Sequence, residues 1–334
     1  MPLDIALDIG TAYTSIFLRT EGVVLREPSV VAIVGKNKVR AVGFEAAEML
    51  GKAPDNVRVV CPVKDGYIVD SLAATLMIRT FLAKITPPNA LFYPRFRCIL
   101  ATPAGLTDEE VRTYERICNT AGIGEVVMAD SVLMAALGVE LPLTSAFGGF
   151  VVDIGGGITK IASVSMCAIL SGCAISIGGD MMDKALGDYI LGKFDIRLGL
   201  RTLRKIKSDI GSLYTNDTAS MVVSGVDAKT HELRSLEIAA SDVGEAVRPY
   251  YAKVADSIEK VIKKCPPEAA AEIHRRGINL TGGAAAIKGL DGFLHSRLKL
   301  PVIAHFDPHL AVIRGSGKLL TNKALLAEVL RGKK

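Results

Sequence analysis

Apolar and polar residues alternate along this chain with two periods, and together they predict an α/β protein. Short apolar runs bounded by turn residues are expected to be strands; they cover residues 4–8, 14–18, 97–101, 124–129, 150–153 and 278–281. Apolar positions at helical spacing predict helices over residues 71–84, 107–121, 201–213 and 242–264. Thr107 and Glu110 have the spacing of a capping box, and Pro266 ends the longest helix. Strands that alternate with helices are typical of α/β folds.

One strand–turn–strand pattern occurs twice, once in each half of the chain. Residues 5–11 read IALDIGT and residues 151–157 read VVDIGGG. In both, an apolar strand ends in an aspartate, Asp8 or Asp153, which is followed by Ile, Gly, a turn and a second strand. This repeat predicts a fold of two similar halves whose loops face each other.

Loops of this composition are suited to phosphate. Glycines let backbone N–H groups approach an anion, threonine adds a hydroxyl donor, and a nearby carboxylate can hold hydrated Mg²⁺. Taken alone, either motif is better explained as a hairpin turn with an exposed aspartate. A third element, INLTGG at 278–283, is a strand followed by two glycines, which lets the backbone lie flat against a nucleoside. The three elements together predict a nucleotide site.

The order DIGT, VVDIGGG and LTGG resembles the nucleotide-binding signature of the actin and sugar-kinase superfamily. Within it, residues 22–31, 62–69, 179–183 and 277–290 are similar to segments of the MreB family of bacterial actins, and the resemblance runs from about residue 4 to residue 320. It implies an α/β, actin-like fold of two duplicated ribonuclease-H-like halves around a nucleotide cleft. The first half is expected over residues 1–140 with a small inserted subdomain at about 32–65, the second over 141–320 with an insertion at about 180–240, and a C-terminal helix with a basic tail over 321–334.

The resemblance also implies a function: an ATP-binding, filament-forming protein that hydrolyses ATP slowly as it polymerises, with ATP and Mg²⁺ as cofactors. Its membrane-associated filaments would organise cell-wall synthesis and determine cell shape, either as the main MreB or as a divergent paralogue. Matched by motif, Asp8 and Asp153 lie near Mg²⁺, through water, and Asp130 and Asp153 orient the attacking water. The nucleotide contacts carried over are Thr11, Ala12, Tyr13, Gly155, Gly156, Gly157, Arg204, Lys205, Ile206, Lys207, Gly282, Gly283, Ala284 and Ala285.

The chain departs from the family pattern at the nucleotide. Tyr13 replaces a small amide, and Arg204 replaces a glutamate in the helix motif. Ile158-Thr159-Lys160 replaces Thr-Thr-Glu, Ala284 replaces a glycine, and Asp130-Ser131-Val132 replaces Glu-Glu-Pro. Because phosphoryl transfer depends on positioning, these changes predict slow hydrolysis. They leave open an actin-like scaffold or adaptor with little or no hydrolysis; a small-molecule kinase would need larger insertions for its acceptor pocket.

Several of these residues also have ordinary structural interpretations. Asp130 is equally expected as a helix cap. Lys160 and Arg204 are expected by default to be solvated surface charges, with a contact to phosphate or to a neighbouring subunit as the alternative.

A membrane contact is expected at Leu91, Phe92 and Tyr93, between Pro88 and Pro94. Three apolar tips beside basic residues can enter a lipid headgroup region, and a filament would repeat them. The expected partners are therefore other copies of the chain, the inner face of the cytoplasmic membrane and membrane proteins of cell-wall elongation. The alternative is that this loop tucks its apolar residues into the core.

Composition and charge argue against a nucleic-acid-binding protein and a membrane-spanning protein. The net charge of +5 comes from 40 basic and 35 acidic residues scattered along the chain, which is not a nucleic-acid footprint. Six cysteines without CxxC spacing predict reduced thiols in a cytoplasmic protein. Residues 161–179 carry no charge, but four serines and a turn-like Ser171-Gly172 favour a buried β-hairpin over a membrane span. The sequence thus predicts a soluble protein, peripheral at the membrane.

Overall fold

The computed structural model describes residues 3–86 and 95–332, and these form two compact units. Unit 1 comprises residues up to Val151 together with Val164–Leu170 and the C-terminal segment from Leu310, and unit 2 comprises Val152–Ser163 and Ser171–His309. The α/β prediction is confirmed. The segment from Leu310 belongs by its contacts to unit 1, whereas the sequence analysis placed residues up to 320 in the second half and set 321–334 apart as a C-terminal helix and tail.

Unit 1 is built on a five-stranded sheet in the order β10-β9-β1-β2-β3. Its strands are β1 (Leu3–Ile9), β2 (Tyr13–Leu18), β3 (Gly22–Pro28), β9 (Phe96–Thr102) and β10 (Ile123–Asp130). β10, β9 and β1 are parallel to one another, while β1, β2 and β3 form an antiparallel meander. The parallel strands therefore end at one edge of the sheet, where the first glycine loop follows β1.

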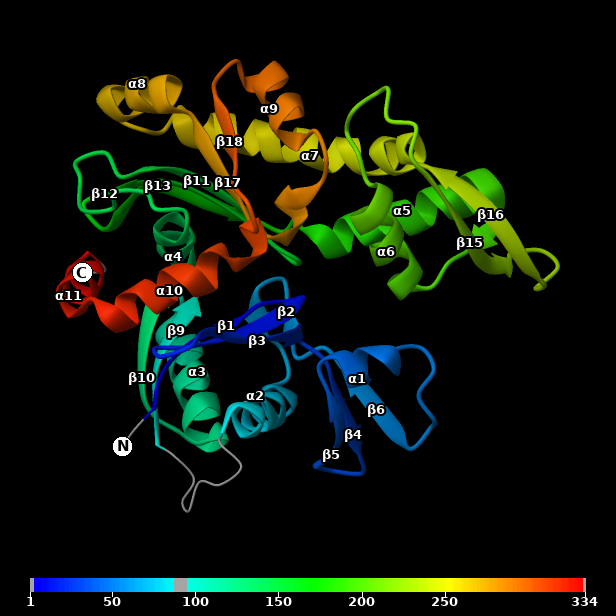
Figure 1. Ribbon diagram of the computed structural model, residues 1–334, viewed down its shortest axis with the longest axis horizontal. Coiled ribbons are helices and arrows are strands. Elements are labelled where there is room, and N and C mark those ends of the chain that lie inside the picture. Colours follow the sequence, from blue (N-terminus) through cyan, green and yellow to red (C-terminus); the bar gives the residue numbers. More distant parts are fainter. Residues whose placement is uncertain (1–2, 87–94, 333–334) are drawn as a thin grey trace. The chain divides into compact units, whose positions relative to one another are not determined.

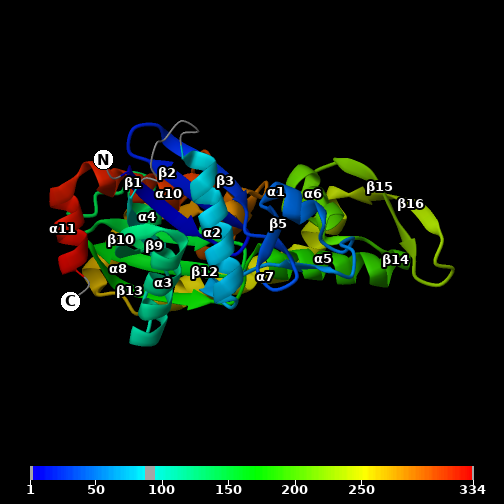
Figure 2. The same cartoon turned by 90° about the horizontal axis from the view of Figure 1, so that it is seen from below.

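Helices cover both faces of this sheet. Helices α2 (Ser71–Ile85) and α3 (Asp108–Ala121) lie on one face of the sheet (Figure 2). Their apolar side chains share one core with alternate residues of β1, such as Ile5 and Leu7. α4 (Ser131–Gly138) and α10 (Ala311–Thr321) pack against each other on the opposite face (Figure 1). α11 (Lys323–Arg331) follows α10. Thr107 caps α3 through the predicted capping box with Glu110.

A small sheet in the order β5-β4-β6 accounts for the insertion predicted at about 32–65. It consists of β4 (Val31–Val34), β5 (Lys38–Val42) and β6 (Val57–Val60), with α1 (Phe44–Glu48) between the last two. Val30, Ala32 and Ala46 form its separate core. A hairpin of β7 (Val63–Lys64) and β8 (Tyr67–Ile68) leads into α2.

The second five-stranded sheet, most of which belongs to unit 2, repeats the plan of the first in the order β13-β12-β11-β17-β18. Its strands are β11 (Gly149–Ile154), β12 (Thr159–Ser165), β13 (Ala168–Ile175), β17 (Ile278–Thr281) and β18 (Val302–Ala304). Three strands consecutive in the sequence are again followed by two strands from later in the chain, added beside the first. This identical order confirms the internal repeat that the two Asp-Ile-Gly motifs predicted.

The helices of unit 2 are α5 (Gly179–Phe194), α6 (Leu200–Ile210), α7 (Ala240–Ile262), α8 (Pro267–Arg276) and α9 (Leu290–Leu298). The long α7 packs on α5, α6 and α9 (Figure 1). A second small sheet joins β14 (Ile196–Arg197), β15 (Ser220–Asp227) and β16 (Leu233–Ala239) and lies within the insertion predicted at about 180–240. Short 3₁₀ turns, η1 (Gly283–Ala286) and η2 (Pro308–Leu310), complete the unit.

The uncharged segment 161–179 contains most of strands β12 and β13, so the predicted hairpin is present. It is buried only along β12, because the residues of β13 are half-buried or exposed. Its turn lies at Met166 and Cys167, both with left-handed backbone angles, instead of at Ser171-Gly172. Within the described ranges, no helix combines the length and the apolar character that crossing a bilayer requires.

Candidate functional site

The first glycine loop, in unit 1, is a tight turn held by its own backbone. The N–H of Gly10 donates to the carbonyl of Tyr13 (3.0 Å), and the hydroxyl of Thr11 accepts from the N–H of Gly66 (2.9 Å). The Tyr13 ring lies under the guanidinium of Arg26, 3.9 Å from the ring centroid. Burial lowers the pKa of Arg26, while the charge of Asp8 opposes this shift. The turn thus brings Thr11 and Tyr13 together beside a half-buried arginine.

Asp130 lies at the same edge of the sheet but does not share a face with Asp8. Asp8 is in register with Ala101 of β9, and Asp130 with the next residue, Thr102. Since successive strand residues point to opposite faces, these two carboxylates begin on opposite sides of the sheet. Asp130 lines a hollow of about 530 Å³ together with Val111 and Glu115 of α3. It is the N-cap residue of α4 but makes no side-chain capping bond, so its role in orienting water stays a prediction.

The second glycine loop, in unit 2, is packed against the first turn of α5. The N–H groups of Gly179 and Asp180 donate to the carbonyls of Gly155 (3.0 Å) and Gly156 (2.8 Å). Gly178 makes this approach possible, because a Cβ there would lie 2.5 Å from the Gly156 carbonyl oxygen. The loop is therefore fixed in position before any ligand binds.

Asp153, at the entry to this loop, is buried and engaged through both carboxylate oxygens. The Thr281 hydroxyl donates to Oδ1 (3.1 Å), and Lys160 Nζ lies 3.7 Å from Oδ2. The Lys160 side chain is only 19% exposed, so the default expectation of a solvated charge is wrong for this residue. Its ammonium faces the carboxylate of Asp153.

Helix α6 contributes two cations that meet the start of α5. Lys207 Nζ donates to the Gly179 carbonyl (2.7 Å) and lies 2.5 Å from an oxygen of Asp183. Arg204 binds Asp180 (2.8 Å) and Asp183 (3.2 Å). Burial alone would lower the pKa of Arg204, but the two carboxylates outweigh it and raise the pKa, whereas burial raises the pKa of Asp180. The default expectation of a solvated charge is therefore wrong for Arg204 as well.

Ile206 and Lys205, the other two residues carried over on α6, do not face the start of α5. Ile206 is fully buried in the core. Lys205 is exposed and forms an ion pair with Asp209 one turn further along. Of the four residues carried over on α6, Lys207 and Arg204 are therefore the two that contact the first turn of α5 beside the glycine loop.

The third motif forms a close backbone contact with the second. Gly282 has φ +87° and ψ 157°, and a Cβ at this position would lie 2.3 Å from the Ile154 carbonyl oxygen. The next residues turn into η1, where the Ala284 carbonyl accepts a hydrogen bond from Tyr251 (2.6 Å). Ala285 is buried and Gly283 is exposed. The predicted nucleoside loop thus lies directly beside the strand that carries Asp153.

Unit 2 therefore assembles a site from residues far apart in the sequence. It brings together the glycines 155–157, Asp153, Lys160, Lys207 and Gly282. Backbone amides and ammonium groups of this kind can hold an anion such as phosphate. Residues that the sequence analysis did not assign to the site support it: Thr281, Gly178, Gly179, Asp183 and Tyr251. The GDMMD segment, which carries Gly179 and Asp183, was noted only for its resemblance.

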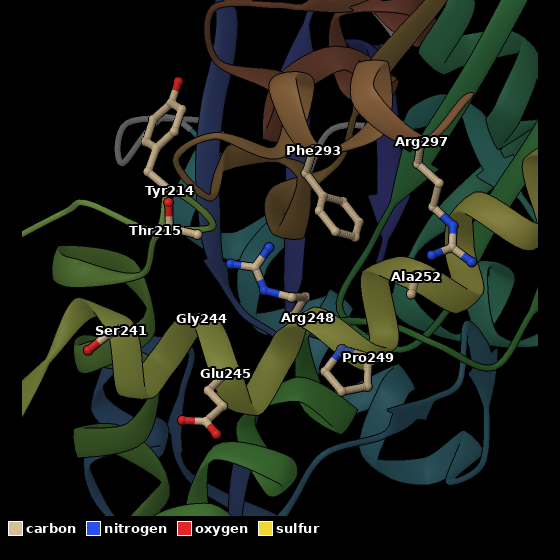
Figure 3. Close-up of a pocket in the computed structure, with 10 residues that line it drawn as sticks. All are labelled: Tyr214, Thr215, Ser241, Gly244, Glu245, Arg248, Pro249, Ala252, Phe293 and Arg297. Atoms are coloured by element: carbon tan, nitrogen blue, oxygen red, sulfur yellow. The ribbon is translucent and has the colours of Figure 1, made fainter. Parts of the chain in front are cut away.

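The predicted membrane residues Leu91, Phe92 and Tyr93 fall outside the described residues. A pocket of about 460 Å³ in unit 2 lies between α7, α9 and the loop after α6 (Figure 3). Its arginines already have partners within the protein, since Arg248 donates to the Leu213 carbonyl (2.9 Å) and Arg297 to Asp256 (2.7 Å). None of the predicted site residues lines it.

The chain as a whole is similar to known proteins. The model of the MreB/Mbl protein family matches residues 2–328. The cell shape-determining protein MreB of Escherichia coli strain K12 is 35% identical over 323 residues, which cover 95% of this chain and 93% of that protein. The cell shape-determining protein Mbl of Bacillus subtilis strain 168 is 33% identical over 321 residues and 96% of each chain.

Solved structures confirm the actin-like fold. MreB5 of Spiroplasma citri bound to ADP has a TM-score of 0.89 at 29% identity over 96% of each chain. The same protein bound to AMPPNP has a TM-score of 0.90 at 28% identity over 99% of each chain. MamK in a double helical filament has a TM-score of 0.80 at 18% identity, covering 96% of this chain and 99% of that one. The actin-like fold thus extends over nearly the whole chain.

Proposed function

The chain belongs to the MreB/Mbl family of bacterial actin-like proteins, and from this we propose that it is an ATP-binding cytoskeletal protein whose filaments act at the cytoplasmic membrane in determining cell shape. The observation that carries nucleotide binding is the site in unit 2. There a fixed glycine loop, the first turn of α5 and two lysines converge on one place. The similar MreB5 structures hold ADP and AMPPNP, which supports an adenine nucleotide as the ligand.

Different residues of unit 2 are suited to different parts of a nucleotide. The Gly155 N–H is used within the turn, so the backbone of Gly156 and Gly157 and the Lys207 ammonium are the groups suited to the phosphates, as N–H donors and positive charge. Gly283, which is exposed, and Ala284 present backbone without bulky side chains, which is suited to the flat face of a nucleoside. Asp183 positions Lys207 and Arg204 and is itself too buried to reach a ligand.

Mg²⁺ is expected beside Asp8 and Asp153, but the surroundings of these two carboxylates differ in how well they suit a metal. When bound, Mg²⁺ would neutralise phosphate charge. Asp153 already accepts a hydrogen bond from Thr281 and faces the ammonium of Lys160, so its contacts argue against a metal beside it. Asp8 lies in unit 1, where its carboxylate interacts electrostatically with the guanidinium of Arg26.

Filament formation is proposed from family membership, and MamK shows that the fold is compatible with a double helical polymer. The expected partners are other copies of the chain, the inner face of the membrane and membrane proteins of cell-wall elongation. Hydrolysis is expected to be slow. The Lys160–Asp153 pair also favours the second candidate, a nucleotide-binding scaffold or adaptor with little or no hydrolysis.

The test begins with ligand-induced stabilisation. A ligand that binds only the native state stabilises it by about 2.7 kcal/mol at a hundred times its Kd, so millimolar ATP should raise the Tm. The shift should shrink in Lys207→Met and persist in Lys263→Met, whose lysine is exposed and loosely paired with Glu259. Absence of any shift with ATP or ADP in the unmodified protein would contradict nucleotide binding.

Assembly needs a separate measurement. Sedimentation and electron microscopy on anionic liposomes, with ATP, ADP or no nucleotide, should show filaments on the lipid in at least one nucleotide state. Phosphate release measured in the same samples separates the two candidates. Release that accompanies assembly favours the slow ATPase, whereas filaments without release favour the scaffold.

A further inference from the structure

The carboxylate of Asp153 has a cation from its own hairpin as its neighbour. The Gly155 N–H donates to the Ile158 carbonyl across the turn (2.9 Å), and counting outward from this bond sets Asp153 opposite Lys160. Residues directly opposite each other on paired strands project to the same face. The structure agrees with this register, since Lys160 Nζ lies 3.7 Å from Asp153 Oδ2 and the side chains are 19% and 7% exposed. The ion pair is therefore built into the glycine loop.

The other carboxylates near the Lys160–Asp153 pair also have cationic partners. Asp180 and Asp183 lie within ion-pair distance of Arg204, and Asp183 also of Lys207. The three carboxylates around the loop in unit 2 thus each have a lysine or an arginine as a partner. A divalent cation at Asp153 would lie next to an ammonium, and like charges repel strongly where the surroundings are shielded from water.

We propose that Lys160 is a phosphate-binding residue that supplies, from the protein, the positive charge that a divalent metal would otherwise bring to a nucleoside triphosphate. This inference rests on the proposed function, because it needs nucleotide at residues 155–157. An ammonium is a compact charge with rotatable donors and binds phosphate without a fixed geometry. Asp153 then acts as a positioning residue that holds the ammonium beside the loop. The consequence is nucleotide binding that does not depend on a divalent cation.

Binding of ATP measured by calorimetry, in buffer with Mg²⁺ and in buffer with EDTA, tests this directly on the unmodified protein. The two Kd values should agree within about threefold, because the charge-assisted contact is present in both buffers. Lys160→Met should weaken binding in EDTA by about tenfold to a hundredfold, the effect of losing a charged hydrogen bond, and Mg²⁺ should restore part of the loss. Lys160→Arg keeps the charge and should retain binding in EDTA.

Lys263→Met is the matched control, because it removes a 77% exposed lysine of the same unit, and its Kd should not change in either buffer. Binding by the unmodified protein in Mg²⁺ that falls more than about tenfold in EDTA overturns the role of Lys160 and leaves the proposed function standing. Equal EDTA affinities of the unmodified protein and a folded Lys160→Met variant also overturn it. No binding in either buffer overturns both. The comparison of Mg²⁺ with EDTA in the unmodified protein needs no variant. It therefore still tests the proposal if Lys160→Met does not fold.

Discussion

At the scale of single residues, the site in unit 2 depends on positions where only one kind of side chain is compatible with the backbone. Gly282 combines a positive φ with an extended ψ, a region that is essentially restricted to glycine. It also lies against the Ile154 carbonyl, in the strand that carries Asp153. A change at this one position therefore disturbs both the nucleoside loop and the phosphate loop.

Gly282→Ala should lower the free energy of unfolding by about 3 kcal/mol or more, because backbone strain and a clash with Ile154 add together. Urea denaturation followed by circular dichroism measures the loss. Gly292→Ala is the matched control, since it lies in α9 with nothing within 4 Å of the new Cβ. The control should gain about 0.5–1 kcal/mol from helix propensity. Equal stabilities of the two variants would contradict this account.

His305 gives the stability of the protein a dependence on pH. Its Nε2 lies 2.9 Å from Asn279 Oδ1, and burial lowers the pKa of His305 below its usual value. The unfolded chain then binds a proton more readily than the native protein does. Stability should therefore fall as pH drops below about 6.5, the ordinary pKa of histidine, and level off below the native pKa.

Urea unfolding between about pH 7.5 and about pH 5 should show this loss in the unmodified protein and a shallower slope in His305→Gln. His231→Gln serves as the control, because His231 is an exposed turn residue. If His305→Gln and the unmodified protein had parallel slopes, His305 would not be the titrating group.

At the scale of elements, the closest helix packing in unit 1 depends on glycines. A Cβ added to Gly315 of α10 would lie 1.9 Å from the Met134 carbonyl of α4, and one added to Gly138 would lie 1.9 Å from the Ala311 carbonyl. The two helices thus meet backbone to backbone, and their contact closes one face of the five-stranded sheet. This contact also explains why the C-terminal segment belongs to unit 1.

Gly315→Ala should cost about 2–3 kcal/mol, because overpacking at a backbone contact forces the helices apart. Gly192→Ala, in α5 with nothing within 4 Å of the added Cβ, should instead be neutral or gain up to about 1 kcal/mol. Thermal and urea unfolding of both variants measure this difference in stability. A stable Gly315→Ala variant would show that α4 and α10 do not pack this closely.

At the scale of the whole molecule, the duplicated sheets give each unit its own core and its own glycine loop. The segment 91–93, between α2 and β9, belongs by sequence to the first half, and its membrane contact stays a prediction. Each large apolar side chain removed from water contributes about 1.5–3 kcal/mol. One copy of the chain should therefore bind lipid marginally, and a filament that repeats the segment should bind firmly.

Co-sedimentation with anionic liposomes should require polymerising conditions and weaken as salt rises, since nearby basic residues each add about 1 kcal/mol of screened attraction. The double variant Leu91→Ser, Phe92→Ser should still polymerise but lose the liposomes. A double variant of Leu233→Ser and Phe306→Ser, whose native side chains are 82% and 89% exposed, controls for the loss of surface apolarity elsewhere. Undiminished lipid binding by the first variant would place the contact at another segment, with the basic tail from Arg331 as the next to test.

The sequence by itself determined the strands, the helices, the repeat and the positions of the glycine loops. These features depend on local patterns: alternation of apolar residues, glycines where the backbone turns, and caps such as Thr107. The family resemblance followed from the same motifs, and the comparisons confirm it. Most of the fold was therefore predictable before any coordinates.

Only the tertiary structure decided where the charges and the C-terminal helix lie. Lys160 and Arg204 were expected at the surface, yet each is partly buried against carboxylates from another strand or helix. Ile206 belongs to the core and not to a ligand. Local propensity does not encode these outcomes, because burial and ion pairing depend on the direction of a side chain and on groups brought close by folding. The chemistry proposed for Lys160 therefore follows from a contact that sequence patterns alone could not show.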